Sequence, residues 1–172
     1  GMVAVRNSSH YGIAGYWTNL AAKENMIGIS GTNARPSVAP TFGVENMLGT
    51  NPLTFSMPTD EPFPFTLDCA TSVIQNGKIE YYARIGHETP EGLGMSREGE
   101  VLTDSVEILK KIRNKQAALA PLGGFGETTG GYKGYGYSTV VEILSAALQS
   151  GIFLRALEGK NEDGSIRPYH LG

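Results

Sequence analysis

The chain has 172 residues, a formal net charge of −3, 40% hydrophobic residues and 18% charged residues. This length supplies one good hydrophobic core and is short for two, while the charge gives no basic surface for nucleic acid. No apolar run reaches the roughly 18 residues that a membrane span needs, and the single cysteine, Cys69, excludes an internal disulfide framework and indicates a reducing, cytoplasmic location.

Short apolar runs alternate with one helical pattern in the first part of the chain. Residues 1–5 form an apolar run that predicts a buried strand, and residues 13–25 carry apolar side chains at helical spacing. Residues 26–30 predict a second strand, and residues 31–52 an irregular connection rich in Pro and Asn. Two further strands are expected over 53–57 and 65–68, separated by a Pro-rich turn.

Helical patterns dominate the second part. We expect a helix over 70–85, with Lys78 pointing outward, then a polar loop over 86–104 and a short amphipathic helix over 105–115. Residues 117–122 predict a strand or extended segment. The most convincing helix is expected over 137–149, apolar over most of its surface and hence largely buried. Residues 166–172 predict a strand or turn.

Together these elements predict an α/β (α+β) protein with one mixed β-sheet flanked by helices. Residues 1–172 are expected to form a single domain. Because both ends resemble strands without lead-in or continuation, we expect this domain to be cut from a longer chain.

The most informative motif is Gly-Gly-Tyr-Lys-Gly-Tyr-Gly, residues 130–136, placed directly before the helix expected from Tyr137. Glycines allow a close ligand approach, and a helix N-terminus offers free N–H groups to an anion. Lys133 adds a positive charge, so a phosphate of a nucleotide cofactor is the natural ligand. The alternative is a merely tight helix start. The loop matches neither the Rossmann fingerprint nor the Walker A motif.

His10 is the candidate acid–base group. An unperturbed imidazole titrates near neutral pH, and a histidine in this position is otherwise structural or simply exposed. Ser8 and Ser9 can orient its ring by hydrogen bonds, and Gly12 permits a tight turn into the following helix. His87 and His170 lie in polar segments and are expected to be exposed.

The segment Asp68-Cys69-Ala70-Thr71 follows a predicted strand and opens a predicted helix. Asp68 or Thr71 is either a plain N-cap or part of a ligand site at this helix start. Cys69 is expected to be a small buried hydrophobe. Arg35 is either an anion contact or a surface charge, and Asn51 is most simply a turn residue. No group of residues has zinc-ligand spacing.

Five motifs occur in one order along the chain: Val-Arg-Asn-Ser-Ser-His-Tyr-Gly (5–12), Ile-Gly-Ile-Ser…Asn-Ala-Arg-Pro (27–36), Gly-Thr-Asn-Pro-Leu (49–53), Leu-Asp-Cys-Ala-Thr-Ser (67–72) and the glycine motif (130–136). Together they resemble the malate/L-lactate dehydrogenase family of the second type. This family also contains sulfolactate and ureidoglycolate enzymes and cyclic imino acid reductases.

The resemblance implies a non-Rossmann NAD(P)-binding domain with the L-sulfolactate dehydrogenase-like fold. Such enzymes transfer hydride between NAD or NADP and a small 2-hydroxy or 2-oxo acid, here malate or L-lactate, and are typically homodimers. The family's catalytic histidine falls on His10. Its cofactor-binding positions fall on Ala34, Arg35, Asp68, Cys69, Ala70 and Lys133, with Gly134 in the glycine motif. Two other interpretations stay open, a non-catalytic nucleotide-binding module and a structural dimerisation domain.

Overall fold

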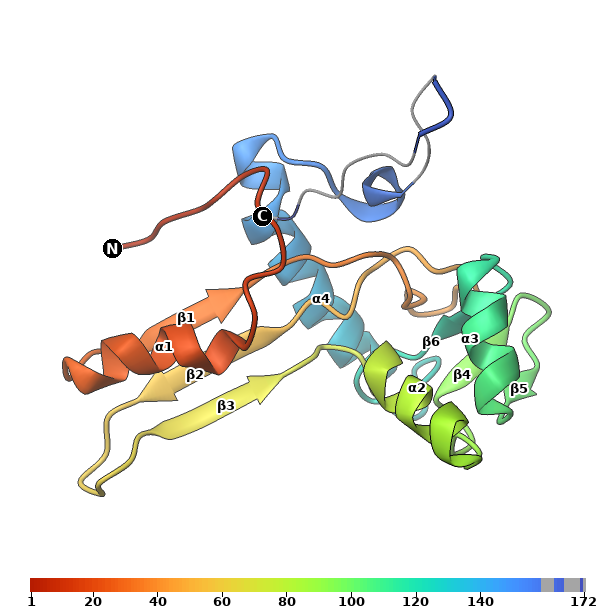
Figure 1. The fold of residues 1–172 in the computed structure, drawn as a ribbon, viewed down its shortest axis with the longest axis horizontal. Helices are drawn as coiled ribbons and strands as arrows, with labels where there is room; N and C mark the ends of the chain where they lie inside the picture. Colours follow the sequence, from red (N-terminus) through yellow and green to blue (C-terminus); the bar gives the residue numbers. More distant parts are fainter. Residues whose placement is uncertain (159–162, 166–170, 172) are drawn as a thin grey trace.

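The computed structural model describes residues 1–158, 163–165 and 171 (Figure 1). Four α-helices and two short 3-10 helices lie in this part of the chain: α1 (Ala14–Lys23), α2 (Asn76–Ile85), α3 (Ser105–Arg113), α4 (Gly131–Ser145), η1 (Ala147–Gln149) and η2 (Leu154–Leu157). The strands are β1 (Gly28–Gly31), β2 (Leu53–Met57), β3 (Phe65–Cys69), β4 (Gly94–Ser96), β5 (Val101–Leu102) and β6 (Ala117–Leu119).

The strands form two three-stranded antiparallel sheets instead of the single mixed sheet that we expected, with orders β1-β2-β3 and β5-β4-β6. Parallel pairing is limited, among the described residues, to an isolated bridge between Val38 and Leu119. The α/β character is confirmed. The strands predicted over 53–57 and 65–68 match β2 and β3 closely, because both segments are extended, rich in β-formers and joined by a turn.

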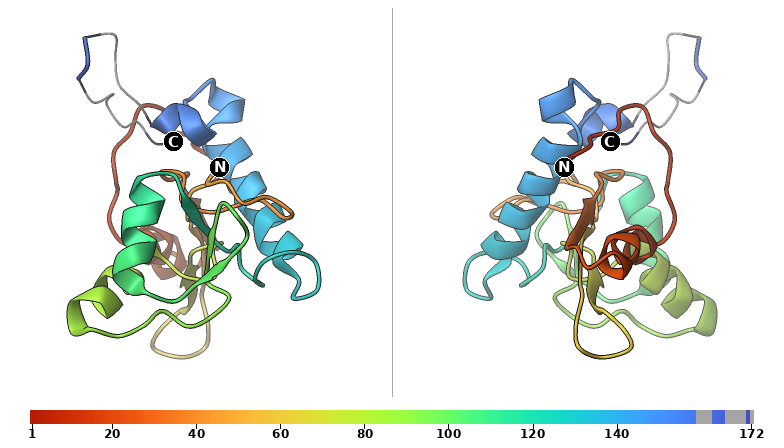
Figure 2. Two further views of the ribbon diagram at one scale, coloured as in Figure 1. Left: turned by 90° about the vertical axis from the view of Figure 1, so that its right-hand side faces the viewer. Right: turned by 90° about the vertical axis from the view of Figure 1, so that its left-hand side faces the viewer.

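Helix α1 lies on a polar face of the first sheet, with α4 on the opposite side (Figure 2). Alternate strand residues point to α1, and among them Thr54 and Ser56 are fully buried. The Thr18 and Ser56 hydroxyls are 2.6 Å apart. Gly28 allows this approach, because a Cβ there would lie 2.8 Å from Thr18 Cα. Hydroxyl pairs and a close backbone contact therefore hold α1 to the sheet.

The other face of this sheet is apolar and partly open to solvent. By register it carries Ile29, Phe55 and Leu67 in one row and Met57 with Phe65 in the next. Ile29, Phe65 and Leu67 are 63%, 57% and 46% exposed. We call these five residues the apolar sheet face.

The second sheet and helices α2 and α3 enclose the main hydrophobic core. Its buried members are Val38, Leu48, Ile79, Leu102, Ile108, Ala117 and Leu119. Helix α3 begins where Asp104 Oδ1 accepts a hydrogen bond from the backbone N–H of Glu107 at 2.8 Å, a standard N-cap. The helix predicted over 105–115 is thus confirmed. The loop predicted over 86–104 is wrong in part, because it contains β4 and β5.

Helix α4 begins at Gly131, six residues before the predicted start at Tyr137, so the glycine motif forms its first turns. Gly130 is the N-cap and has φ +84°, a conformation that glycine adopts without strain. A Cβ at Gly131 would lie 2.9 Å from the Gly124 carbonyl carbon, and one at Gly134 would lie 2.7 Å from Leu122 Cα. These glycines let α4 pack directly on the backbone of residues 122–124.

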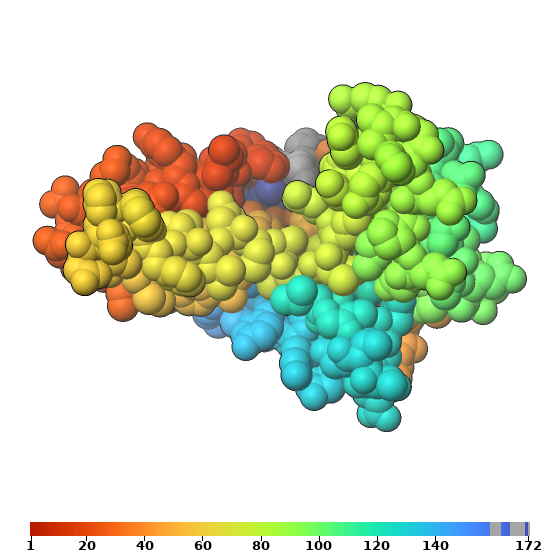
Figure 3. All heavy atoms as spheres, turned by 90° about the horizontal axis from the view of Figure 1, so that it is seen from below, coloured from red at the N-terminus to blue at the C-terminus, as the bar shows by residue number. Residues whose placement is uncertain are grey.

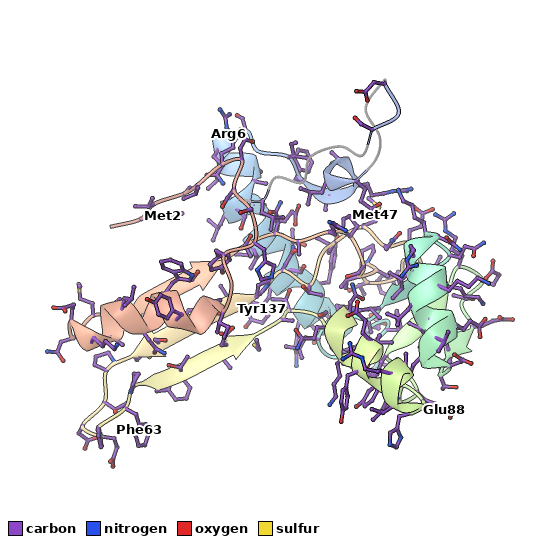
Figure 4. The ribbon with its side chains drawn as sticks, viewed as in Figure 1. Met2, Arg6, Met47, Phe63, Glu88 and Tyr137 are labelled. Carbon is purple, nitrogen blue, oxygen red and sulfur yellow. The ribbon has the colours of Figure 1, made fainter. Side chains whose placement is uncertain are left out.

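Three further expectations are wrong. Residues 1–5 are exposed and not in a strand, and Figure 4 marks Met2 on this segment, apart from the sheets. Helix α2 begins at Asn76 instead of residue 70. Helix α4 buries Val141 but leaves Val140, Ile143 and Leu144 between 40% and 48% exposed, so it is not buried over most of its surface.

Of the segment 166–172, only Leu171 is described, and it forms an isolated bridge with Ser8. The expected strand or turn over 166–172, with the exposed His170, therefore lies outside the described residues. In the described part of the chain, no helix has the length and apolar character to cross a membrane.

Candidate functional site

A cavity of about 750 Å³ lies between the first sheet and α2. The turn that enters α1 forms one side, and the end of β3 with the segment leading into α2 forms the other. Asn33, Ala34, Thr50 and Pro52 form a third wall. Figure 3 shows this face of the molecule, with the red-orange N-terminal part and the yellow-green atoms around α2 on either side of the hollow. Of the predicted site residues, the cavity brings together His10, Ala34, Asp68, Cys69 and Ala70.

His10 lines the cavity from the turn before α1. Its Nδ1 accepts a hydrogen bond from the backbone N–H of Gly12 at 3.1 Å, so Nε2 carries the proton of the neutral ring in this geometry. Gly12 has φ +84°, as the predicted tight turn requires. The Ser8 hydroxyl donates to the Ser9 carbonyl instead of the imidazole. The ring is thus oriented by backbone, and the expected orienting role of Ser8 is wrong.

Asp68 stands at the end of β3 and caps a helix distant in sequence. Its Oδ2 accepts from the backbone N–H of Gly15 at 2.7 Å, in the first turn of α1, and its Oδ1 accepts from the Thr54 hydroxyl at 2.9 Å. A carboxylate is favoured at this position by the free N–H groups and the helix dipole. The expectation that Asp68 or Thr71 caps the helix following β3 is wrong, since α2 begins at Asn76 with Gln75 as N-cap. Asp68 instead ties the His10 turn to the sheet.

The wall at Ala34 depends on buried side chains behind it. The Ala34 N–H donates to Asn51 Oδ1 at 2.9 Å, and Asn51 Nδ2 donates to Glu142 Oε2 at 2.7 Å. Asn51 is fully buried with φ +35°, so it is more than the simple turn residue that we expected. Arg35 is exposed and is not among the residues that line the cavity.

Lys133 and Gly134 also lie outside the residues that line the cavity. The N–H groups of Lys133 and Gly134 donate to the carbonyls of Gly130 and Leu122 at 3.0 and 3.1 Å, so the protein itself uses two of the N–H groups expected to face an anion. The Lys133 ammonium is 5.9 Å from the Tyr132 ring centroid. Leu122 lines the cavity, and through it the start of α4 adjoins the site.

Sequence reasoning missed Lys78 and misjudged Cys69. Lys78 is exposed, as expected, and it also lines the cavity from the first turn of α2, with its ammonium 4.9 Å from the Tyr82 ring centroid. A lysine in the first turn of a helix is unfavourable for the helix dipole, and this misplacement was the available signal. Cys69 is exposed and lines the cavity, so its expected burial is wrong. His87 is exposed, as predicted.

Tyr11 follows His10 and also lines the cavity. Burial raises the pKa of its hydroxyl above the usual value; the hydrogen bond to Ser30, 3.1 Å between oxygens, opposes this, and the negative charge of Asp68 adds to it. The phenol therefore stays neutral at physiological pH. In the described part of the chain no cluster of three or more His, Cys, Asp and Glu side chains is placed to hold a metal ion.

Comparison with known proteins identifies the group to which this site belongs. The family model described as malate/L-lactate dehydrogenase matches residues 1–172. The chain belongs to this family. The malate dehydrogenase of Pyrococcus horikoshii is 51% identical over 165 residues, which are 96% of this chain and 44% of that protein. The L-sulfolactate dehydrogenase of Methanocaldococcus jannaschii is 39% identical over 146 residues, 85% of this chain and 38% of that protein.

Solved structures of the malate/L-lactate dehydrogenase family confirm the expected fold. The crystal structure of malate dehydrogenase from Entamoeba histolytica superposes with a TM-score of 0.86 and 47% identity, covering 88% of this chain and 42% of that one. Sulfolactate dehydrogenase from M. jannaschii gives a TM-score of 0.69 at 32% identity, covering 96% and 44%. The chain therefore spans less than half the length of the curated relatives it matches.

Proposed function

We propose that residues 1–172 form a cofactor-binding domain that holds NAD or NADP and transfers hydride to or from a small 2-hydroxy or 2-oxo acid. The observation that carries this proposal is the cavity itself, which gathers His10, Ala34, Asp68, Cys69 and Ala70 from three separate parts of the chain. Its volume lies within the range of about 300–1,000 Å³ that small-molecule and cofactor sites occupy. Its lining offers backbone groups, an imidazole, a carboxylate and the Lys78 ammonium, a donor set that suits a nucleotide.

His10 moves the proton in this proposal. The nicotinamide, when bound, supplies or accepts the hydride at the substrate carbon. In the reducing direction the imidazolium donates its proton to the carbonyl oxygen as negative charge develops there, and in the oxidising direction the neutral ring takes the hydroxyl proton. An imidazolium has hydrogens on both nitrogens, so the Gly12 N–H cannot donate to it. Each protonation of His10 therefore releases the ring from the Gly12 contact.

The remaining predicted cofactor positions lie in the cavity walls or beside them. Ala34 and the segment Asp68–Ala70 supply the walls of the cavity. Arg35 follows Ala34 in the chain, and in this proposal its guanidinium contacts a phosphate of the cofactor. Lys133 and Gly134 contribute from the start of α4 through the neighbouring Leu122, and an exposed lysine can reach a cofactor that extends past the cavity. The single cysteine in the sequence supports a reducing compartment such as the cytoplasm.

Malate is the proposed substrate, with L-lactate as the second choice. Relatives named as malate dehydrogenases from two Pyrococcus species are 51% and 52% identical to this chain, whereas those named for sulfolactate and imino acid substrates are 30–39% identical. This grading of identity supports the choice of malate.

We also propose a homodimer. An apolar surface formed by several neighbouring large side chains is typical of an interaction site, and the apolar sheet face is such a surface. Light scattering after gel filtration should give twice the chain mass, and Phe65→Lys with Leu67→Lys should give the monomer. Phe42→Lys is the matched control, because Phe42 is 80% exposed and lies off this face. A monomeric wild-type chain, or a double variant that stays dimeric, would contradict the proposal.

The cofactor proposal is tested by titrating the chain with NADH and then NADPH, following nucleotide fluorescence. Saturable binding is expected, weakened strongly by Lys133→Ala and unchanged by Lys23→Ala, a matched loss of one positive charge at the far end of α1. With NAD and malate, His10→Ala should lower turnover by about 10²–10⁴-fold at nearly unchanged nucleotide affinity. Equal loss of turnover and affinity would remove the acid–base role from His10.

A further inference from the structure

The third wall of the cavity is hydrogen-bonded from behind to a buried carboxylate that belongs to α4. Glu142 lies in the last turn of α4, is only 6% exposed, and stands in the apolar run Val-Val-Glu-Ile-Leu. Desolvating a carboxylate costs several kcal/mol unless hydrogen bonds compensate. Here three donors do so, and each comes from a different segment.

Through Glu142, the three donors link the cavity wall to the start of η2 at Leu154. Glu142 Oε2 accepts from Asn51 Nδ2 at 2.7 Å, and Oε1 accepts from the backbone N–H of Leu154 at 2.7 Å and from Asn33 Nδ2 at 3.4 Å. Asn33 and Asn51 are both fully buried. Asn33 itself lines the cavity, and Asn51 lies between two lining residues, Thr50 and Pro52.

The contact with Asn51 extends to the backbone that faces the cavity. Because Nδ2 of Asn51 is held by Glu142 and by the Ser138 carbonyl at 3.1 Å, its Oδ1 must point to the other side, where it accepts from the Ala34 N–H at 2.9 Å. A rotated Asn51 amide would place NH₂ against the Ala34 N–H, two donors face to face. The carboxylate thus fixes the orientation of the amide, and the amide fixes Ala34.

We propose that Glu142 is a positioning residue for the cofactor cavity, acting through Asn51 on the backbone at Ala34. The inference rests on the proposed function for what the cavity binds, but the positioning itself is a property of the chain. Glu142 touches neither cofactor nor substrate in this role. It sets the wall against which the cofactor lies.

The discriminating variant is Glu142→Gln. It keeps the shape and one oxygen. We expect this oxygen where Leu154 and Asn33 both donate, so the NH₂ group faces Asn51 Nδ2. Either that hydrogen bond is lost or Asn51 rotates and releases Ala34. We expect the exchange rate of the Ala34 amide hydrogen, followed by NMR, and the dissociation constant for the nucleotide each to rise by about tenfold.

A second substitution should restore the contact. Asn51→Asp alone places two carboxylates side by side, so it should weaken nucleotide binding as well. When Glu142→Gln is combined with Asn51→Asp, the new amide at position 142 donates to one oxygen of the new carboxylate at position 51, while the other oxygen still accepts from Ala34. The oxygen at position 51 that accepts from this amide also faces the Ser138 carbonyl, to which Asn51 donates in the wild type, so recovery is partial. The double variant should bind the nucleotide more tightly than Asn51→Asp alone, the non-additivity expected of residues in direct contact.

Thr89→Val is the matched control. The Thr89 hydroxyl lies 2.8 Å from that of Ser105, both buried, in the part of the molecule built on the second sheet. This substitution removes a buried hydrogen bond and should lower stability without changing Ala34 exchange or nucleotide affinity. Normal Ala34 exchange and normal affinity in Glu142→Gln, or no recovery in the double variant, would overturn the inference. If the wild-type chain binds neither nucleotide, the proposed function fails, whereas Ala34 exchange still decides the positioning role.

Discussion

The close contact at the start of α4 gives a sharp prediction for Gly134→Ala. In an open helix this substitution would stabilise the protein by about 0.5–1 kcal/mol. Here the new Cβ would lie 2.7 Å from Leu122 Cα and nearer still to the Leu122 N and O atoms, which belong to backbone. Close-packed interiors do not absorb such an overlap, so α4 must move by about 1 Å.

The expected cost follows from that movement. Overpacking costs about 1–3 kcal/mol or more, and the shift also weakens the hydrogen bond from the Gly134 N–H to the Leu122 carbonyl, now 3.1 Å. After the gain in helix propensity, Gly134→Ala should lower the free energy of unfolding by about 2 kcal/mol. Urea unfolding followed by circular dichroism and Trp17 fluorescence measures it.

Gly136→Ala is the control on the same helix. No atom lies within 4 Å of the Cβ that it would add, so it should raise the free energy of unfolding by about 0.5–1 kcal/mol. If Gly134→Ala were as stable as Gly136→Ala, the direct contact of α4 with the backbone at Leu122 would be refuted.

Three other outcomes are expected. Asp68→Ala, which uncaps α1, should lower the free energy of unfolding in urea by about 1–2 kcal/mol and weaken nucleotide binding. Asp104→Ala, which uncaps α3, should lower it by about 1 kcal/mol and leave nucleotide binding intact. Equal effects of the two substitutions on binding would contradict the placement of Asp68 in the nucleotide site. The pKa of Tyr11 is higher in the folded chain than in the unfolded chain, where it is about 10. Its contribution to stability is therefore complete below about pH 10 and is lost as the pH rises from there through the folded pKa. Tyr11→Phe should flatten the decline of the unfolding free energy above about pH 10. A thiol reagent should modify Cys69 in the native chain, and NADH should slow the reaction; protection by malate alone would argue against a cofactor wall there.

Local patterns predicted the elements whose stability is local. The helix over 105–115 has its cap at Asp104 and an apolar stripe, and β2 and β3 are neighbours in sequence. The apolar run at residues 2–5 was misleading, because a strand needs a pairing partner and no described strand pairs with it. The glycine motif indicated that another group packs closely against this segment, but not which group. Only the fold shows that it is the backbone of residues 122–124.

The site divides in the same way. His10, Ala34 and Asp68 could be named from motifs and resemblance, and the fold brings them to one cavity. The wall behind Ala34 could not be predicted, because Asn51 and Glu142 lie 91 positions apart. A lone glutamate within an apolar helical run was the available signal. Asp68 was expected to cap a helix nearby in sequence, whereas its partner Gly15 lies 53 positions away.

Helix α4 joins two of these features at a fixed spacing. Gly134 and Glu142 are eight residues apart on one rigid helix, a distance of about 12 Å. Any displacement where the glycines meet residues 122–124 is therefore carried to the carboxylate as a rigid-body movement. Selection on nucleotide binding would then act on the position of α4 against residues 122–124, and natural variants with impaired binding should occur at the glycines of this contact, which do not themselves line the cavity.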